Sequence, residues 1–277
     1  MQDHTKLRLD RVAVVGKFGS RPAEDAARAV AEKFLAGGST VYTISPISVG
    51  GAEEAGTVAD LRGKGLDLVV TLGGDGTTLR AFRHLEDETP VLTVNVGGNR
   101  GILSEITLDM LDSAITQMRE DRVILERRTR VAASAGGEEF PPALNEIFIQ
   151  RKNLTKTAEI EIRFLDDTVR QKMDGVIIAT PSGSTGHSFS LGGPILHESL
   201  SVLIITPVAP VYRLASIVVP DEKIEFSCSH DCSVVMDAQV VKSVGFGEPI
   251  TIKKYARQAV FVRLGRRGLR QMSKLGF

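Results

Sequence analysis

The chain has 277 residues, of which 42% are hydrophobic and 25% charged, an ordinary globular composition that suits one large domain or two smaller ones, and we predict two. Its 34 basic and 34 acidic side chains cancel, so no bulk charge draws it to nucleic acid or to an anionic membrane, and small-molecule chemistry is favoured. No apolar run approaches the ~20 residues of a membrane span and the start MQDHTKLRLD is not an apolar signal segment, so we expect a soluble, cytoplasmic protein with no nucleic-acid or membrane partner.

The first part of the chain alternates β-rich runs with helix-like segments. Strands are expected at 11–18, 40–46, 66–74 and 90–97, and helices at 22–35, 52–62, 77–85 and 108–120. Ser20 can cap the first helix, Pro22 lies in its first turn, and Gly37 and Gly38 follow its end. Runs such as LDLVV and PVLTV are apolar on both sides, as in a parallel sheet covered by helices. The pattern predicts an N-terminal α/β domain with a parallel sheet over residues 1–121.

Beyond Asp121 the sequence changes to strands separated by turn signals. The runs RVILERRTRVAASAGG, ALNEIFIQ, AEIEIRFLDD and VRQKMDGVIIATP have a period nearer two than 3.6, and Gly136-Gly137 and Asp166-Asp167 suit hairpin turns. We predict an all-β C-terminal domain over residues 122–255. The tail 256–277 is expected to return to the first domain, with RRGLRQMSKLGF as a short terminal helix.

The two cysteines, Cys228 and Cys232, occur in CSHDC with His230 between them. A structural zinc ion needs four ligands and no second cluster lies nearby, so we expect two reduced thiols in a strand region. The sequence predicts no metal site and no disulfide framework.

The stretch TLGGDGTTLR, residues 71–80, places three glycines and one acid directly after an apolar run. A strand that ends in glycines and continues into a helix presents free backbone N–H groups and the positive end of a helix dipole, which favours phosphate. Asp75 is repelled by phosphates unless it meets a hydroxyl proton, a bound cation or a ribose. The combination indicates phosphoryl transfer to an alcohol, and an ordinary turn is the alternative. Neither a P-loop nor a G-x-G-x-x-G fingerprint is present.

A second informative stretch is DGVIIATPSGSTGHSFSLGGP, residues 174–194. A strand leads into a loop of small hydroxyl residues, which offers many hydrogen-bond groups with little bulk and suits the sugar and phosphates of a nucleotide. A Ser/Gly-rich surface loop is the plain alternative. A serine hydrolase is disfavoured, because the nucleophile elbow G-x-S-x-G would need glycine where Ser182 stands.

Together these stretches resemble the NAD kinase family, which phosphorylates the adenosine ribose 2'-hydroxyl of NAD to give NADP. The resemblance rests on GGDGT at 73–77, on the pair Asn145-Glu146, and on TPSGSTGHSFSLGGP, which is similar to the family's TPTGSTAY-x-x-S-x-GGP. ITPVAP, IVVP and Asp237-Ala238-Gln239 add weaker likeness, so the resemblance extends over roughly residues 11–277.

The resemblance implies an α/β domain followed by a β domain, NAD in the cleft between them, and a homodimer or homotetramer. Asp75 is then the general base, with Mg²⁺ or another divalent cation and with ATP or polyphosphate as phosphoryl donor. Asp174 is expected to reach the ligand of a neighbouring subunit, and Lys156, Lys172 and Arg80 are either basic contacts or solvated surface charges. The expected substrate-binding residues are Gly73, Gly74, Gly76, Thr77, Arg80, Asn145, Glu146, Lys156, Lys172, Asp174, Ser182, Thr185, Gly186, His187, Ser188, Phe189, Ser190, Ala209 and Gln239.

Three departures from the family pattern are visible. Gly186-His187 stands where the family has Ala-Tyr, Ser182 replaces a threonine, and VNVGGNRGIL at 94–103 fits I-N-x-G-x-x-G-F-L with its last glycine one residue late. Two other functions stay open at this point: a kinase of another alcohol that shares the GGDG loop, such as a lipid kinase, and a non-catalytic NADP sensor. TPSGSTG favours NAD over the first. Asp75 argues against the second, because a pure binder has little reason to hold an unpaired carboxylate near phosphates.

Overall fold

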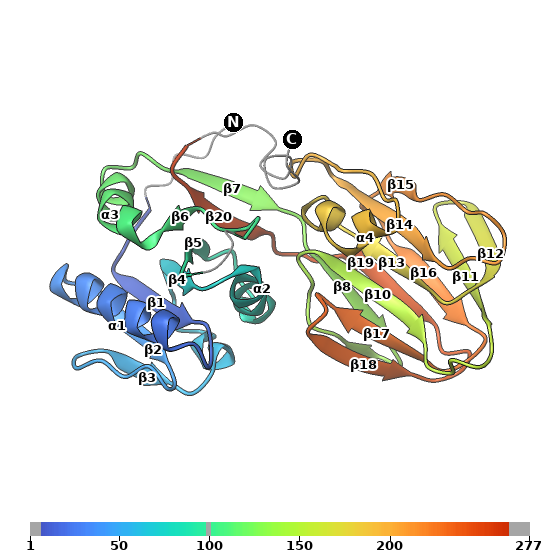
Figure 1. The fold of residues 1–277 in the computed structure, drawn as a ribbon, viewed down its shortest axis with the longest axis horizontal. Coiled ribbons are helices and arrows are strands. Elements are labelled where there is room, and N and C mark those ends of the chain that lie inside the picture. The colour runs from blue at the N-terminus through green and yellow to red at the C-terminus, as the bar shows by residue number, and fades with distance from the viewer. Residues whose placement is uncertain (1–6, 98–100, 266–277) are drawn as a thin grey trace. The chain divides into compact units, whose positions relative to one another are not determined.

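The computed structural model describes residues 7–97 and 101–265. The chain forms two compact units, one that contains the residues up to Arg127 and those from Ala259 onward, and one that consists of Arg128–Gln258. The chain therefore leaves the first unit once and returns to it (Figure 1). The first unit extends past the expected boundary at Asp121 because strand β7 joins its sheet. The expected terminal helix in RRGLRQMSKLGF begins at Arg266 and lies outside the described residues.

The first unit is built on a largely parallel sheet. Its strand order is β3-β2-β1-β4-β5-β20-β7, with β6 beside β5. The pairs from β3 to β5, and those of β5 with β6 and β20, are parallel. The order reverses at β1, which has β2 on one side and β4 on the other. The strands are β1 (Arg11–Gly16), β2 (Thr40–Ile44), β3 (Glu53–Ala55), β4 (Leu68–Leu72), β5 (Pro90–Asn95), β6 (Ile106–Thr107), β7 (Ile124–Arg128) and β20 (Ala259–Arg263).

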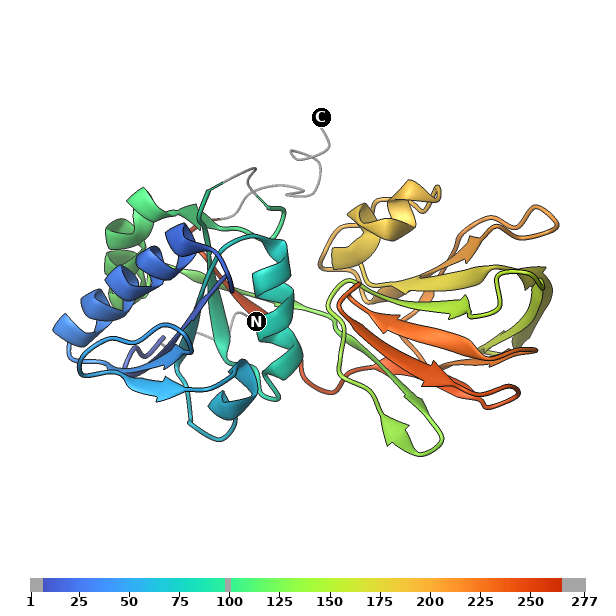
Figure 2. The ribbon, with the colours of Figure 1, turned by 60° about the horizontal axis from the view of Figure 1, so that its bottom comes forward.

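Helices cover both faces of this sheet. Helices α1 (Arg21–Ala36) and α3 (Leu111–Arg119) share one face, and Lys33 of α1 lies 2.6 Å from Asp112 of α3. Helix α2 (Asp75–His84) covers the other face (Figure 2), where the ring centroids of Phe82 and Phe261 are 4.7 Å apart. The predicted α/β domain with a buried parallel sheet is confirmed.

Two expected helices differ from the structure. The prediction of a helix at 52–62 is wrong, because Glu53–Ala55 instead pairs with β2 as the edge strand β3, which ends before Gly56. The 3-10 turn η1 (Val58–Leu61) follows, and Thr57 and Asp60 form a capping box at its start. The helix expected at 108–120 consists of the 3-10 turn η2 (Leu108–Met110) and α3. Ser20 is the N-cap of α1, but its side chain makes no capping hydrogen bond.

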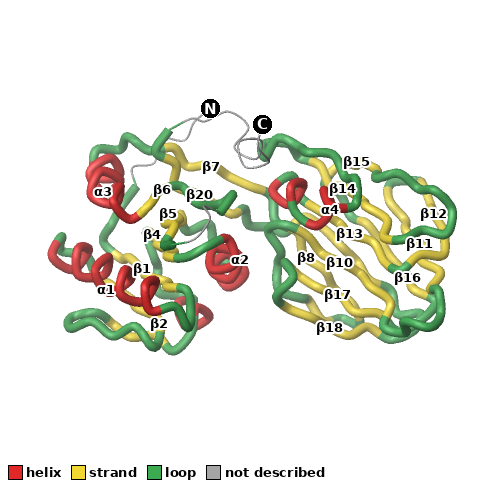
Figure 3. Tube along the Cα trace, in the orientation of Figure 1, coloured by secondary structure: helices red, strands yellow, loops and turns green. Residues whose placement is uncertain are grey.

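The second unit consists of two sheets, whose strands are the yellow segments on the right of Figure 3. The pairing within each sheet is antiparallel. One has the order β15-β14-β13-β10-β17-β18 and the other the order β12-β11-β16-β19-β8-β9. The hairpin expected at Gly136-Gly137 is confirmed as β8-β9. The hairpin expected at Asp166-Asp167 is confirmed as β11-β12, but its turn consists of Leu165 and Asp166, because Asp167 already pairs with Phe164. The strands are β8 (Val131–Ala135), β9 (Glu138–Glu139), β10 (Glu146–Arg151), β11 (Ala158–Phe164), β12 (Asp167–Met173), β13 (Gly175–Ala179), β14 (Val202–Val208), β15 (Ile217–Pro220), β16 (Ile224–Cys228), β17 (Cys232–Met236), β18 (Val240–Val244) and β19 (Ile250–Lys254).

The core of the second unit lies between its two sheets. Alternate residues of the strands point inward, so that Ile147 and Ile149 of β10 share one apolar cluster with Ile160 and Ile162 of β11. Each isoleucine buried in this way contributes roughly 1.5–3 kcal/mol. The outer face of β13 and β14 carries a smaller cluster, to which Phe148 packs. The short helical segments η3 (Ser182–Thr185) and α4 (His187–Ser190) follow β13 directly.

The two cysteines lie at the ends of successive strands. Cys228 ends β16 and Cys232 begins β17, and both thiols are buried and free. A hydrogen bond between them lowers the pKa of Cys228 and raises that of Cys232. Among the described residues, no group of three or more His, Cys, Asp or Glu side chains is arranged to hold a metal ion. Within the same part of the chain, no helix has the length and apolar character that crossing a membrane requires.

Candidate functional site

The glycine-rich loop of the first unit lies where β4 ends and α2 begins. Its backbone is fixed on both sides, since Gly73 N donates to the carbonyl of Val94 at 3.0 Å and Lys17 N donates to that of Leu72 at 2.8 Å. Gly73 has a φ of +150°, and a Cβ there would lie 2.6 Å from Thr77 Oγ1. Glycine is therefore required at this position. The loop lies at the carboxyl ends of β1 and β4, where the strand order reverses, which is where open parallel sheets bind ligands.

Asp75 is the first residue of α2, and its carboxylate is held by backbone amides. Oδ2 accepts from Ile102 N at 3.0 Å and Oδ1 accepts from Leu103 N at 3.1 Å. The expectation that Asp75 is an unpaired carboxylate is therefore wrong, because the segment after β5 supplies two N–H donors to it. A carboxylate has four acceptor positions, so such donors orient it without removing its capacity to accept a proton.

The other expected residues of the first unit are neighbours of Asp75 in the sequence. Gly74 is the N-cap of α2 and has open space where a Cβ would be, and Gly76 is exposed in the first turn. Thr77 is buried, and its N–H donates to the carbonyl of Gly74 at 3.1 Å. The loop thus offers an exposed, side-chain-free backbone next to the positive end of a helix, which suits a phosphate.

Arg80 is not a solvated surface charge. Its NH2 group donates to the carbonyl of Gly16 at 2.9 Å, and its buried Nε has no hydrogen-bond partner among the described residues. Burial lowers the pKa of this guanidinium. Arg80 therefore ties α2 to the end of β1, one turn beyond Asp75. Gly98, Asn99 and Arg100 of the expected VNVGGNRGIL loop lie outside the described residues.

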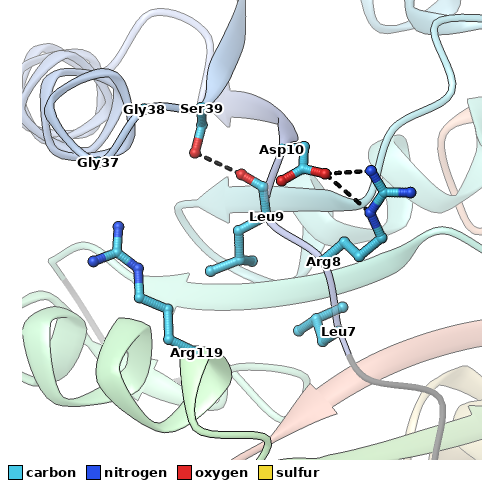
Figure 4. A pocket seen from close by; sticks show the side chains of 8 residues that line it. All are labelled: Leu7, Arg8, Leu9, Asp10, Gly37, Gly38, Ser39 and Arg119. Atoms are coloured by element: carbon cyan, nitrogen blue, oxygen red, sulfur yellow. Dashed lines mark hydrogen bonds and ion pairs between the residues drawn. The ribbon is translucent and has the colours of Figure 1, made fainter.

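A separate pocket lies at the opposite end of the strands of the same sheet. It is lined by Leu7, Arg8, Leu9, Asp10, Gly37, Gly38, Ser39 and Arg119 (Figure 4). Ser39 Oγ donates to the carbonyl of Leu9 at 2.6 Å, and Arg8 pairs with Asp10. Its walls include the residues that enter β1, so the pocket is at the amino ends of the strands. Ligand crevices of parallel sheets lie at the carboxyl ends, and we therefore assign the glycine-rich loop as the candidate site.

In the second unit, Asn145 and Glu146 stand at the start of β10. The carboxylate of Asp237 accepts from the backbone amides of Leu144 at 3.0 Å, Asn145 at 2.8 Å and Glu146 at 3.3 Å. From the other side, Thr180 Oγ1 donates to the carbonyl of Leu144 at 2.5 Å and Thr180 N donates to that of Asn145 at 2.8 Å. The backbone of the pair is therefore held by the turn after β17 and by the residue after β13.

The TPSGSTG segment packs directly on this pair. A Cβ at Gly183 would lie 2.1 Å from the carbonyl oxygen of Asn145, and one at Gly186 would lie 3.1 Å from Glu146 Oε2. Asn145 Oδ1, Glu146 Oε2 and Thr185 Oγ1 are buried and have no hydrogen-bond partner among the described residues. Buried polar atoms are normally satisfied, so unpartnered oxygens gathered at one end of a sheet indicate a ligand.

Glu146 is the titratable group of this cluster. Burial, and to a smaller extent the nearby charge of Asp237, together raise the pKa of Glu146 to about 7. A strongly shifted carboxyl beside unpartnered polar atoms is typical of a functional site.

The remaining residues of the segment differ in what they can offer. Ser182 is buried, 3.4 Å from Arg128 NH1, and Ser188 Oγ bonds to Thr206 Oγ1 at 2.7 Å. His187 is exposed and its ring meets that of Phe148 edge-on, with centroids 5.4 Å apart. Phe189 and Ser190 are exposed. The segment therefore combines hydroxyls that bind within the protein with an exposed histidine and phenylalanine on its surface.

Asp174 and Ala209 lie at the other end of the same sheet, next to β13 and β14, whereas Lys172 is on β12 of the second sheet. Asp174 precedes the five-residue strand β13 and Thr180 follows it, and these six steps of extended chain span roughly 20 Å. Asp174 Oδ1 accepts from Arg151 Nε at 2.7 Å. The structure therefore does not bring Asp174 to Asn145. Lys172 and Lys156 are exposed, and Ala209 is exposed with a φ of +47°.

Gln239 belongs instead to the Asn145 end of the sheet. It is exposed in the turn between β17 and β18, two residues after Asp237.

Sequence reasoning missed three groups at these sites. The amides of Ile102 and Leu103 carry no side-chain signal, because any residue supplies an N–H. Thr180 and Asp237 were visible as members of quoted motifs, but their roles depend on strands that pair across the chain. The signal for Asp237 was a carboxyl residue at a tight turn between two apolar strands.

The fold and the two clusters define a two-domain, nucleotide-directed phosphotransferase. A family model for the ATP-NAD kinase N-terminal domain matches residues 12–123, and one for the ATP-NAD kinase C-terminal domain matches residues 132–264. The NAD kinase of Methanothermobacter thermautotrophicus is 30% identical over 263 residues, which cover 92% of each chain. That of Geotalea daltonii is 36% identical over 211 residues, which cover 71% of this chain and 73% of the relative. The chain belongs to the NAD kinase family.

Solved structures agree with this assignment. An NAD kinase from Archaeoglobus fulgidus in complex with ATP has a TM-score of 0.72 and 31% identity, over 96% of this chain and 97% of that one. A yeast NADH kinase complexed with NADH has a TM-score of 0.87 at 20% identity, over 97% and 88% of the two chains, and this likeness concerns the fold. The predicted fold class and family are confirmed, and the chain is a kinase whose family activity converts NAD to NADP.

Proposed function

We propose that this chain transfers the terminal phosphoryl group of ATP to the 2'-hydroxyl of the adenosine ribose of NAD, with Asp75 as the general base. The observation that carries the proposal is the Asp75 carboxylate, which begins α2 beside Gly73 and is oriented by the amides of Ile102 and Leu103. A charge fixed by backbone donors at a bare glycine loop is suited to a hydroxyl that approaches a phosphate.

In the proposed reaction, Asp75 accepts the proton of the 2'-hydroxyl. The hydroxyl oxygen forms a bond to the terminal phosphorus of ATP while the bond from that phosphorus to its bridging oxygen breaks. NADP and ADP leave, and the proton passes from Asp75 to solvent. The exposed backbone at Gly74 and Gly76 and the helix dipole stabilise phosphate charge. General-base assistance of this kind contributes roughly 10² to 10⁴ in rate.

A divalent cation fits the proposal as a companion of the nucleotide. Among the described residues no cluster of three or more candidate ligands forms a protein cage for a metal, and Mg²⁺ typically binds through one or two carboxylates together with substrate phosphates. Asp75 is the carboxylate of the glycine loop that would contribute. When bound, the cation would neutralise charge on the donor phosphates.

The Asn145 cluster supplies the nucleoside contacts in this proposal. The unpartnered oxygens of Asn145, Glu146 and Thr185 accept hydrogen bonds, which ribose hydroxyls and the adenine amino group donate. His187 and Phe189 offer ring surfaces close to these oxygens in the chain. Discrimination against a nucleotide that lacks these groups follows from leaving buried oxygens unpaired.

The residues around Asp174 have a different role in the proposal. Asp174 and Ala209 are at the far end of the sheet from Asn145, and Lys172 is on β12, two residues before Asp174. In the proposal, these residues contact the ligand of a neighbouring copy in a homodimer or homotetramer. Lys156 is exposed on the loop after β10 and has the same proposed role. A cytoplasmic location belongs to the same proposal, and polyphosphate is the alternative donor.

Two other functions are not favoured. A lipid kinase or other alcohol kinase would share the GGDG loop, but the relatives that match over most of the chain are named NAD kinase. A non-catalytic NADP sensor has no use for a carboxylate that backbone donors hold at a phosphate loop.

The test is to incubate the purified chain with ATP, Mg²⁺ and NAD and to follow NADP with an NADP-specific dehydrogenase. The proposal predicts NADP formation that depends on all three components. If NADP appears only when polyphosphate replaces ATP, the proposed phosphoryl donor is wrong, and NAD is supported as the acceptor. Tight NADP binding without turnover on either donor would contradict the proposal and identify a sensor.

A further inference from the structure

We propose that Asp237 is a positioning residue that holds Asn145 and Glu146 in place for the nucleotide. This inference rests on the proposed binding role of Asn145 and Glu146, and it assigns to a third residue the geometry on which that role depends. Asp237 itself is 3% exposed and its carboxylate is directed to backbone amides, so it acts through its neighbours.

The contacts between Asp237 and the start of β10 run in both directions. Its carboxylate takes three consecutive N–H donors, from Leu144, Asn145 and Glu146, and its own N–H donates to the carbonyl of Glu146 at 3.0 Å. Three consecutive amides that converge on one carboxylate form a fixed turn. An anion is the acceptor this geometry requires, since charge-assisted bonds are stronger than neutral ones and one carboxylate accepts several.

The turn that carries Asp237 is itself built for this placement. Asp237 and Ala238 have φ values of +49° and +54°, in the left-handed region that non-glycine residues rarely adopt. Met236 and Val240 pair across the turn, and Gln239 N donates to the carbonyl of Met236 at 3.0 Å. Two successive strained residues at a buried carboxyl indicate that the direction of the side chain is maintained against a local cost.

The consequence appears at the side chains of the pair. Because Asp237 and Thr180 bind the backbone of this turn, Asn145 Oδ1 and Glu146 Oε2 remain without partners among the described residues. A turn with a free backbone would let these side chains fold back onto their own amides. Asp237 thus keeps two acceptors directed toward a ligand.

The charge of Asp237 gives this role a signature in the pH dependence. The ionisable groups on the segments packed around Glu146 are Asp237, His187 at the start of α4, and the buried pair Arg128 and Glu198 behind Ser182. Burial and the Asp237 charge raise the pKa of Glu146 to about 7. Ionised Glu146 accepts hydrogen bonds, so nucleotide affinity increases as pH rises through that value. Loss of the Asp237 charge lowers the pKa of Glu146 and weakens this dependence.

The experiment compares Asp237→Asn with the wild-type chain by kcat and KM for NAD and by calorimetric NAD binding, from pH 6 to pH 8. We expect KM and Kd for NAD to increase about tenfold or more, kcat to change by less than about threefold, and the ratio of KM at pH 6 to KM at pH 8 to be smaller than in the wild type, because burial still raises the pKa of Glu146 after the Asp237 charge is lost. Asp231→Asn is the matched control. Asp231 is at the other end of β17, where its Oδ1 accepts from Phe246 N at 2.9 Å, and this variant should keep wild-type values.

Three results would overturn the inference. One is an unchanged KM and Kd in Asp237→Asn, and another is a raised KM whose pH ratio equals that of the wild type, which identifies a merely structural role. If Asp237→Asn does not fold, Asp237→Glu decides: it keeps the charge but displaces the carboxylate by one methylene group, and an unchanged KM and Kd for NAD in this variant is the third result. Calorimetry separates this question from catalysis, because a wild-type chain that binds NAD without forming NADP contradicts the proposed function and leaves the test of Asp237 intact.

Discussion

The Cα of Gly101 lies against the carboxylate of Asp75, so closely that a Cβ at Gly101 would be 1.9 Å from Asp75 Oδ1. The next two residues, Ile102 and Leu103, donate their amides to the same carboxylate. Glycine at this position therefore allows the backbone to reach the side chain it orients. The Gly101 segment and Asp75 form one unit whose geometry sets the direction of the proposed base.

We predict that Gly101→Ala lowers kcat at least tenfold, because the new methyl group displaces either the carboxylate or the two amides. A displacement near 1 Å at a reacting group costs on the order of 10²-fold in rate. KM for NAD should change less than kcat, since the nucleoside contacts are on the second unit. Steady-state kinetics of NADP formation provide the measurement. Gly50→Ala is the control, because no atom lies within 4 Å of the added Cβ, and equal kcat in both variants would refute the role of Gly101.

A second prediction concerns stability and pH at Glu146. Burial raises the pKa of this carboxyl from 4.5 to about 7, so between these values the folded chain binds more protons than the unfolded chain. The stabilisation that Glu146 contributes to the folded chain is fully present below the pKa of the unfolded chain, 4.5, and is lost as pH rises through the pKa of the folded chain, about 7. Glu146→Gln removes this loss, and its stability relative to the wild type should therefore increase from pH 5 to pH 8, by a few kcal/mol at most.

Thermal unfolding without nucleotide measures this difference. The wild-type chain and Glu146→Gln are compared at pH 5 and pH 8 in the same buffer system. A difference in Tm that is the same at both pH values would mean that Glu146 titrates normally.

A third prediction concerns the buried guanidinium of Arg263 on β20. Its nitrogens lie 3.2 Å from carboxylate oxygens of both Glu105 and Glu126, and Arg263 and Glu105 are almost wholly buried. Arg263→Met leaves the Glu105 carboxylate in the interior without this partner. The free energy of unfolding should fall by about 3–5 kcal/mol, as for other broken buried pairs. Urea unfolding gives this value.

The control for Arg263 is the exposed pair of Lys33 and Asp112 on the same unit. Lys33→Ala should change stability by less than about 1 kcal/mol, because solvent screens exposed pairs. A loss at Arg263 no larger than that at Lys33 would show that β20 is held in the sheet by its apolar residues alone.

Local sequence signals predicted much of this architecture. Continuous apolar runs such as LVVTL predict the parallel sheet, because its strands are buried on both faces. Alternation of apolar and polar residues predicts the strands of the second unit, because these are buried on one face. The edge strand β3 does not show in the local sequence, because Glu53-Glu54-Ala55 has helical propensity and its pairing with β2 is a tertiary effect. Strand β20 was hidden for the same reason, since its neighbour β5 lies far away in the sequence.

The candidate site divides along similar lines. Gly73 and Asp75 are predicted because glycines and a carboxylate at the end of a strand suit a phosphate and a hydroxyl, whereas Asn145 and Glu146 are implied by the resemblance to the NAD kinase family. The sequence does not show that three backbone amides donate to Asp237 or that two donate to Asp75, because these contacts depend on which strands become neighbours. Asp174 and Thr185 occur in one continuous stretch of sequence, but β13 separates them in the fold.

The most direct test of the account is the rate of NADP formation by Asp75→Asn, measured together with NAD binding by calorimetry. Asparagine has nearly the size of aspartate but cannot take the hydroxyl proton at neutral pH. The account predicts a rate lower by roughly 10² to 10⁴ with a Kd for NAD within about threefold of the wild-type value. A variant that binds NAD normally and still forms NADP at a rate within tenfold of the wild type would show that Asp75 is not the base.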